Sequence, residues 1–408
     1  MKEERGISTT FIYGGETSMM PQDACLPDYS GNGIVNVMSA IEALFGGNNP
    51  YPTHAKLSKN EIKKTKNIVL IAVDGFGFNF FEQHFKNSGL NKYLAGGITS
   101  VFPSTTAAAM TTIYTGMAPL NHAILAWFTY FKELGVIGIM PPMLVRGDKG
   151  LLVKGGVDPA KLLGIEPMFD RIHARCFMLS PSDFLKKPYN IIVAGRGQQV
   201  GFGKFDEMLD RTANVVKNNP GEKLVLSYWP TFDQIAHEAG TTSPAALDHA
   251  KYLVDCLASF IENFKPQHPD TTIIITADHG MIDATPGDLI RLESHPGLKD
   301  TLAMPLCGEP RAAFCYVRPS KAGQFEEYVD RHLSHACTAA KIQDVLAEGI
   351  FGKFDPHPCL FDRVGDYILF MKDRYILKDL LLGETRTPLI GHHGGVSKDE
   401  MLVPLFVA

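Results

Sequence analysis

Three stretches of the chain are strongly apolar and end abruptly in acidic or polar residues. They are residues 67–75 (NIVLIAVDG), 223–229 (KLVLSYW) and 271–280 (TTIIITADHG). A run without alternating polar residues is typical of a strand buried on both faces, as in a parallel sheet. Because such a sheet must be covered by helices on both sides, these runs constrain the fold more than any other feature of the sequence.

Helical patterns lie between these runs. Residues 244–264 (PAALDHAKYLVDCLASFIENF) place apolar side chains along one side of a helix, and a shorter helix is predicted over residues 34–45. Weaker strand patterns occur at residues 97–102 and 176–180. This alternation predicts an α/β fold, with a mostly parallel central sheet flanked by helices.

The length of the chain, 408 residues, exceeds that of an ordinary single domain. Its character changes after Pro286, where loop-like sequence is followed by short strand, helix and strand patterns. We therefore expect three parts along the chain. Residues 1–286 form the first part of the α/β core, residues 287–385 form a smaller α+β cap, and residues 386–408 return to the core.

Charge and cysteine content narrow the class of protein. A net charge of −5 gives no broad basic surface, so no stable nucleic-acid partner is expected. Seven irregularly spaced cysteines without a CxxC pair argue against a disulfide framework and favour a reducing compartment. We find no Sec-type signal and no apolar run long enough to span a membrane. We predict a cytoplasmic location, with export by another route still open, and the oligomeric state is left undetermined.

Acids and histidines gather where the predicted strands end. Asp74 closes the first run, Asp278 and His279 close the third, and Asp233 and His237 follow the second within one helical turn. Each feature alone has a structural explanation, such as a turn, a helix cap or a pair on a helix face. In an open α/β sheet, however, ligands bind beyond the carboxyl ends of the strands. Together these residues predict one site at that edge.

This set of side chains suits divalent metal ions. Carboxylate and imidazole ligands without thiolate favour zinc or manganese. Two cations roughly 4 Å apart can hold both the attacking and the leaving oxygen of a phosphoryl transfer. Residues 101–116 (VFPSTTAAAMTTIYTG) are rich in hydroxyls and uncharged, which indicates either a capped helix packed through small residues or a helix that begins at a nucleophilic hydroxyl.

The order of these residues resembles the alkaline phosphatase superfamily, and within it the nucleotide pyrophosphatase/phosphodiesterase group. The resemblance rests on Asp74, the segment Phe102-Pro103-Ser104-Thr105-Thr106 followed by Thr115-Gly116, Asp233 with His237, Asp278-His279-Gly280, and a late His393-Gly394. It implies an alkaline phosphatase-like fold and two zinc ions, with manganese as the alternative metal.

The resemblance also implies a role for each residue. It assigns one zinc to Asp74, Thr106, Asp278 and His279, and the other to Asp233, His237 and His393. Thr106 would attack phosphorus and form a covalent phospho-threonine, which water then hydrolyses. Thr105 and then Ser104 are the next candidates for the nucleophile, and His393 is preferred to His392 because a glycine follows it.

The implied reaction is hydrolysis of a phosphodiester or pyrophosphate bond in a small, nucleotide-like substrate. The chain departs from the group where an asparagine that holds a phosphate oxygen is expected. Trp127 occupies that position, and Asn121 lies nearby but out of register. With Arg311, whose guanidinium can bind a phosphate or form an ion pair between cap and core, these are our candidate substrate-binding residues.

Two other readings remain open. A phosphomonoesterase or phosphonate hydrolase of the same superfamily is the enzymatic alternative. A catalytically inactive metal-binding or regulatory member is the non-enzymatic one, and it would be marked by a missing metal ligand.

Overall fold

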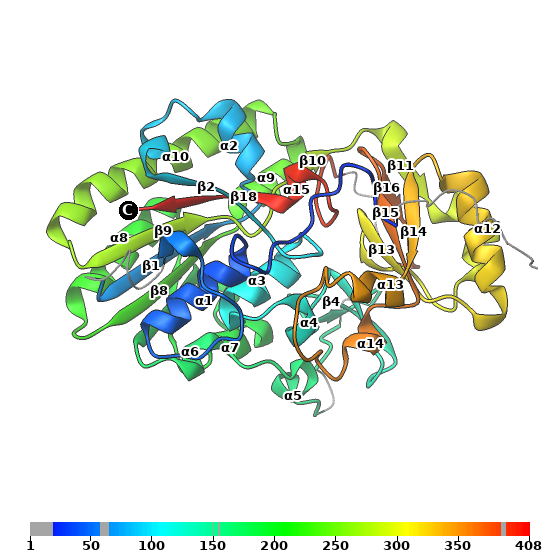
Figure 1. The fold of residues 1–408 in the computed structure, drawn as a ribbon, viewed down its shortest axis with the longest axis horizontal. Coiled ribbons are helices and arrows are strands. Elements are labelled where there is room, and N and C mark those ends of the chain that lie inside the picture. Colours follow the sequence, from blue (N-terminus) through cyan, green and yellow to red (C-terminus); the bar gives the residue numbers. More distant parts are fainter. Residues whose placement is uncertain (1–18, 58–64, 149, 154–155, 385–388) are drawn as a thin grey trace, which may run out of the picture.

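A computed structural model describes residues 19–57, 65–148, 150–153, 156–384 and 389–408. Its two largest sheets lie in two lobes of unequal size (Figure 1). The larger lobe holds the predicted central sheet, and the smaller lobe holds a second sheet with helix α12 (Ala322–Leu333) at the far end of the molecule. The N-terminal segment in which we found no Sec signal, residues 1–18, lies outside the described residues.

The central sheet has seven strands in the order β2-β18-β9-β1-β8-β6-β7. Their bounds are β1 (Asn67–Val73), β2 (Leu94–Thr99), β6 (Arg175–Pro181), β7 (Gln198–Phe202), β8 (Lys223–Trp229), β9 (Thr271–Thr276) and β18 (Leu402–Val407). The five strands from β9 to β7 are parallel, whereas β18 runs antiparallel to both of its neighbours. Every residue of β1, β8 and β9 is buried, which confirms the predicted α/β fold with a mostly parallel sheet.

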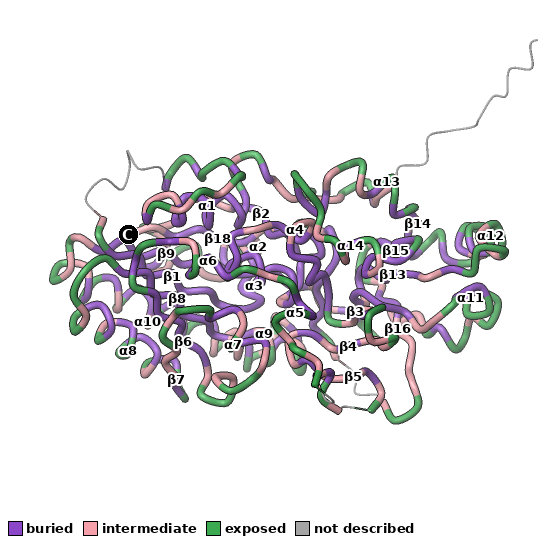
Figure 2. Tube along the Cα trace, turned by 90° about the horizontal axis from the view of Figure 1, so that it is seen from below, coloured by how far each residue is buried: buried purple, intermediate pink, exposed green. Residues whose placement is uncertain are grey.

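Helices cover both faces of this sheet. Figure 1 shows α2 (Phe78–His84) and α10 (Pro244–Phe264) on one side and α1 (Ile34–Leu44), α6 (Met168–Arg171) and α7 (Pro188–Ala194) on the other. Further helices of this lobe are α3 (Thr106–Thr115), α8 (Phe205–Asn218) and α9 (Thr231–Ala239). Figure 2 shows the resulting pattern of burial, with buried strands inside and exposed residues along the outer helices.

The second sheet also has seven strands, in the order β14-β15-β13-β12-β3-β4-β5, and all its pairs are antiparallel. The strands are β3 (Phe128–Phe131), β4 (Val136–Ile139), β5 (Leu144–Val145), β12 (Cys307–Glu309), β13 (Ala312–Cys315), β14 (Cys337–Lys341) and β15 (Tyr367–Met371). Around them lie α4 (Pro119–His122), α5 (Pro159–Leu163), α11 (Pro296–Thr301), α13 (Ile342–Ala347) and α14 (Leu360–Arg363).

This pairing bears on the expected division of the chain. Strands β3 to β5 belong to the second sheet, although they lie within the residues that we assigned to the first part of the core. The boundaries at residues 286 and 386 remain a prediction, and a cap defined by its sheet would also take in residues 128–145.

Two small sheets complete the fold. Strand β10 (Ile282–Asp283) pairs antiparallel with β17 (Gly391–His392), and β11 (Leu289–Arg291) pairs parallel with β16 (Ile376–Lys378). The last helix, α15 (Lys398–Met401), leads into β18. In the described ranges, no helix combines the length and apolar character that a membrane crossing requires.

Candidate active site

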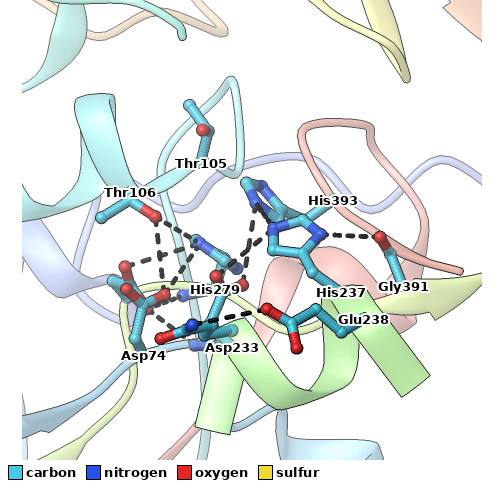
Figure 3. A network of polar contacts seen from close by, with 12 residues as sticks. Asp74, Thr105, Thr106, Asp233, His237, Glu238, His279, Gly391 and His393 are labelled. Carbon is cyan, nitrogen blue, oxygen red and sulfur yellow. Dashed lines mark hydrogen bonds and ion pairs between the residues drawn. The ribbon is translucent and has the colours of Figure 1, made fainter. Parts of the chain in front are cut away.

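Six of the residues singled out from the sequence meet at the carboxyl edge of the central sheet, and five of them are labelled in Figure 3. They are Asp74 after β1, Asp233 and His237 on α9, Asp278 and His279 after β9, and His393 after β17. They form two groups, within each of which the potential ligand atoms lie within 4.8 Å of one another. The first group is Asp74, Asp278 and His279, and the second is Asp233, His237 and His393.

The turn after β1 brings the two groups close to each other. Gly75 has φ of 72°, the left-handed region that glycine enters without steric cost. Its backbone N–H donates to Asp278 Oδ1 at 3.1 Å. A Cβ at this position would lie 3.1 Å from the Asp233 Cβ and 2.9 Å from Met281 Sδ. The glycine therefore allows the β1 turn to pass directly beside the helix that carries the second group.

The first group is almost completely buried. His279 Nε2 lies 3.3 Å from Asp74 Oδ1 and 3.5 Å from Asp278 Oδ2. The Tyr228 hydroxyl, at the end of β8, donates to the other carboxylate oxygen of Asp74. Asp74 is thus held from one side by a phenol and faces an imidazole on the other.

The second group is built from the same kinds of atoms. His237 Nε2 lies 3.3 Å from Asp233 Oδ2, and His393 Nε2 lies 3.8 Å from Asp233 Oδ1. The two imidazoles approach each other with 3.2 Å between their Nε2 atoms. Since Asp233 and His237 are one turn apart on α9, the helix presents both to the same centre.

Backbone carbonyls fix the tautomer of all three histidines. Nδ1 of His237 lies 2.7 Å from the Gly391 carbonyl, Nδ1 of His279 lies 3.1 Å from that of Gly280, and Nδ1 of His393 lies 3.2 Å from that of Ser104. A carbonyl only accepts, so each Nδ1 carries a proton and each ring turns its Nε2 to the centre. This is the arrangement that prepares imidazole for a metal ion.

Burial and like charge disturb the titration of these groups. Burial raises the pKa of Asp74 and of Asp233, and the negative charge of Asp278 raises both further. Burial lowers the pKa of His237 to about 4. Buried acidic side chains thus lie close together here, and divalent cations would stabilise their charged forms.

Two carboxylate oxygens test whether cations fit here. Asp278 Oδ2 in the first group and Asp233 Oδ1 in the second are buried, and neither has a hydrogen-bond partner in the described part of the chain. A buried carboxylate oxygen without a donor is costly. One such oxygen in each group, next to inward Nε2 lone pairs, matches the nitrogen and oxygen ligation of zinc or manganese.

Thr106 is the hydroxyl next to these groups. It is the first residue of α3, and its Oγ1 lies 3.2 Å from His279 Nε2 and 3.5 Å from Asp74 Oδ1. The two alternative nucleophiles are engaged elsewhere. Thr105 Oγ1 donates to Glu309 at 2.7 Å, and Ser104 Oγ donates to the Gly395 carbonyl at 2.8 Å.

The groups open into a cavity of about 710 Å³ between the two lobes. Thr106, Asp233, His237 and His393 line its inner end. Trp127, with 42 % of its surface exposed, lines the wall beside them. The cavity is therefore large enough for a small organic molecule with one end at the carboxylate and histidine groups.

A family model described as type I phosphodiesterase / nucleotide pyrophosphatase matches residues 68–395. The chain belongs to this family. It is a hydrolase of phosphoester bonds, and members of the family are metal-dependent. A search of the curated proteins gave no match.

Solved structures share the fold. The murine ectonucleotide pyrophosphatase / phosphodiesterase 5 is 16% identical, with a TM-score of 0.63 over 83% of this chain and 87% of that chain. The human protein of the same name is 18% identical, with a TM-score of 0.61 and the same coverage. Phosphonoacetate hydrolase from Sinorhizobium meliloti 1021, in complex with phosphonoformate, is 16% identical, with a TM-score of 0.60 over 83% of this chain and 89% of that chain. These likenesses confirm the alkaline phosphatase-like fold.

Two of our candidate substrate-binding residues do not line the cavity of this phosphodiesterase-family chain. Arg311 is buried and forms an ion pair with Glu400, with N–O distances of 3.0 and 3.1 Å. The Asn121 amide donates to the carbonyls of Lys353 and Asp355, both at 3.0 Å. The structure supports the ion-pair alternative for Arg311 and a loop-holding role for Asn121, because their polar atoms are already paired.

His392, the alternative to His393, faces another partner. Its Nε2 lies 3.1 Å from the Leu389 carbonyl, and it belongs to neither potential ligand group. The choice of His393 from the glycine that follows it therefore agrees with where the structure places the two rings.

Sequence reasoning missed Glu309 and Tyr228. One Glu309 oxygen accepts from the Thr105 hydroxyl and from the Trp127 N–H, each at 2.7 Å. Burial raises the pKa of Glu309 to about 7. Tyr228 lies in the apolar run of β8, where the sequence predicts a residue of the hydrophobic core. Glu309 lies in the loop-like stretch CGEPR. Neither position carries a local signal that points to the site.

Proposed function

We propose that this phosphodiesterase-family protein hydrolyses a phosphodiester or pyrophosphate bond with two zinc ions and a covalent phospho-threonine on Thr106. One observation carries the proposal. The Thr106 hydroxyl lies within 3.5 Å of both Asp74 and His279, at the start of a helix and beside two groups of metal-type ligands. A predicted cytoplasmic location and a small nucleotide-like substrate complete it.

The metal assignment follows the two groups. Asp74, Asp278, His279 and Thr106 would hold one zinc ion, and Asp233, His237 and His393 would hold the other. Zinc would supply Lewis-acid stabilisation of charge and would favour the ionised form of a bound hydroxyl or water. Manganese is compatible with the same ligand set. We propose zinc because three of the ligands are imidazoles, which suit zinc better than manganese.

The chemistry at phosphorus is a double displacement. The Thr106 hydroxyl loses its proton as Oγ1 forms a bond to phosphorus, and the bond to the leaving oxygen breaks with its electrons on that oxygen, which takes up a proton. Water then loses a proton as it attacks the phospho-threonine, and the bond between phosphorus and Oγ1 breaks, with Oγ1 regaining a proton. The start of α3 presents backbone N–H groups and the positive end of the helix dipole to the phosphoryl oxygens.

The cavity favours a diester over a simple monoester. Its wall beside the site includes Trp127, Phe128 and Leu306, which give an apolar surface for a second ester group. A catalytically inactive member is disfavoured, because all six ligand residues and the hydroxyl are present and near one another.

Substitution of Thr106 tests the proposal. Thr106→Ala should lower the rate of bis-p-nitrophenyl phosphate hydrolysis by about a thousandfold or more, while the zinc content stays close to that of the wild type. Thr106→Ser keeps a hydroxyl and should retain measurable turnover. Thr105→Ala is the matched control and should stay within about tenfold of the wild type, because its hydroxyl faces Glu309.

A covalent intermediate gives a second readout. Acid quenching during turnover, followed by mass spectrometry, should find phosphoryl mass on the peptide that contains Thr106 and none in Thr106→Ala. Full activity in Thr106→Ala would refute the nucleophile. A panel with a monoester, a phosphonate and a nucleotide diester then assigns the bond that is cleaved.

A further inference from the structure

A pair of cations lines the active-site cavity. Arg291 on β11 and Lys378 on β16 are directly opposite each other in the register of this two-stranded parallel sheet. Residues in register on neighbouring strands point to the same face, and both side chains line the cavity. Like charges placed opposite each other destabilise a sheet.

Among the described residues, these cations have no carboxylate partner. In the described part of the chain, neither Arg291 nor Lys378 takes part in an ion pair. No described carboxylate therefore neutralises their charge. Arg291 is exposed at the cavity, and Lys378 is half-buried.

The nearby acids are already engaged. Asp379 and Glu384 both hold the buried Arg146, with N–O distances of 2.5 and 2.9 Å. The second Asp379 oxygen accepts from the Leu306 N–H at 2.9 Å, and Glu293 accepts from the Leu380 N–H at the same distance. The carboxylates of this wall thus serve Arg146 and the backbone, and they leave the two cations facing the cavity.

The titration of the lysine agrees with this geometry. Burial lowers the pKa of Lys378, and the positive charge of Arg291 lowers it further. An anion between the two side chains would reverse both effects, since it would replace lost hydration and separate two like charges. Arginine and lysine together offer several donors to an oxyanion.

We infer that Arg291 and Lys378 form a second anion subsite of the cavity, which binds an anionic group of the substrate away from the phosphorus that reacts. This inference rests on the proposed function, because that function places the reacting phosphoryl group at Thr106. The substrate class is then a phosphoester that carries a further phosphate or carboxylate. The cavity joins both ends, since Lys378, Thr106 and His393 all line it.

Calorimetric titration of the zinc-loaded protein with uncleavable probes tests the subsite. The probes are alkylene bisphosphonates with two or more methylene groups, phosphonocarboxylates of the same lengths, and alkylphosphonates as references with a single anionic group. At one chain length, the wild type should bind a probe with two anionic groups about tenfold more tightly than the matched alkylphosphonate. The double variant Arg291→Gln/Lys378→Gln should lose this advantage.

The arms of the experiment separate the sources of the anion. A larger gain with bisphosphonates assigns a phosphate to the subsite, and a larger gain with phosphonocarboxylates assigns a carboxylate. Each single variant should lose part of the advantage. Lys299→Gln, which removes an exposed positive charge on α11 outside the cavity, is the matched control and should keep it.

Several results would overturn the inference. One is that the wild type binds probes with two anionic groups no more tightly than alkylphosphonates at every chain length, or binds no phosphonate at all. The tighter binding of the two-anion probes would also count against the inference if it survived in the double variant, or if Lys299→Gln lost it equally. The same preparations are assayed with bis-p-nitrophenyl phosphate. Because the probes are not cleaved, a wild type that fails to hydrolyse this diester contradicts the proposed function and leaves the binding result readable.

Discussion

At the scale of single residues, Glu309 links the start of α3 to the cavity wall. Its carboxyl accepts from Thr105, which directly precedes Thr106, and from the backbone of Trp127. It is buried and has no cationic partner in the described part of the chain, so its charged form is penalised by lost hydration. The protein tolerates this cost next to the site.

The first prediction concerns the pH dependence that Glu309 creates. Burial raises the pKa of Glu309 from 4.5 to about 7, so the folded metal-free protein loses stability as pH rises through this interval. Glu309→Gln cannot ionise and should escape the loss. Relative to the wild type, the variant should therefore gain about 3 kcal/mol in free energy of unfolding between about pH 4 and about pH 8.

Urea unfolding of both metal-free proteins at the two pH values measures this gain. The difference between variant and wild type cancels the titration of the groups that do not interact with Glu309. A difference that is equal at both pH values would contradict the raised pKa of Glu309.

The site residues divide into those that the sequence predicts and those that it does not. Asp74 and Asp278 end apolar runs, and this position fixes them at one sheet edge because parallel strands share their direction. Glu309 comes from the second sheet, and only the packing of the two lobes brings it to Thr105. Arg311 shows the converse, since a guanidinium near a predicted phosphate site is instead used by Glu400.

At the scale of elements, the turn after β1 decides whether the two ligand groups can meet. The second prediction is that Gly75→Ala lowers both stability and zinc affinity. Its Cβ would meet Met281 and Asp233 in a backbone conformation that alanine avoids. We expect the free energy of unfolding to fall by about 1–3 kcal/mol. We also expect weaker zinc binding at the second group, because relief of the contact displaces Asp233.

Gly31→Ala is the control for this substitution. A Cβ at Gly31 has open space around it, so the change should stay within about 0.5 kcal/mol. Unfolding in urea and titration with zinc compare the two variants. Equal stability and equal zinc affinity in both would show that the β1 turn does not hold Asp233 in place.

Strands β1, β8 and β9 were predictable because burial on both faces leaves a continuous apolar run. The direction of β18 was not predictable, because a buried apolar run is the same for parallel and antiparallel pairing. The connection through α15 sets the direction of this strand. Strand β2 spans Leu94–Thr99, earlier than the predicted residues 97–102, because its glycines and partly buried residues mask the pattern.

At the scale of the whole molecule, a buried ion pair joins the two sheets. Arg311 directly precedes β13 of the second sheet, and Glu400 lies in α15, which leads into β18 of the central sheet. The Arg311 guanidinium also donates to the Tyr375 carbonyl at 2.6 Å. Because the cavity lies between the lobes, this contact helps to set the distance between its walls.

The third prediction is that Arg311→Met destabilises the protein by about 3–5 kcal/mol, because the Glu400 carboxylate would remain buried without its cation. Adding Glu400→Gln removes that charge and keeps an acceptor for the Gly395 N–H, so the double variant should recover about half of the loss. Urea unfolding of the single and double variants provides the test. No recovery in the double variant would show that the ion pair is not the origin of the effect.

The central claim is that side chains from β1, α9, β9 and β17 enclose two cations beside the Thr106 hydroxyl. Anomalous diffraction at the zinc edge, from crystals of the zinc-loaded wild type, tests it most directly. We predict two peaks, one among Asp74, Asp278, His279 and Thr106 Oγ1, and one among Asp233, His237 and His393. Zinc bound only elsewhere, or no zinc next to the Thr106 oxygen, would contradict the account.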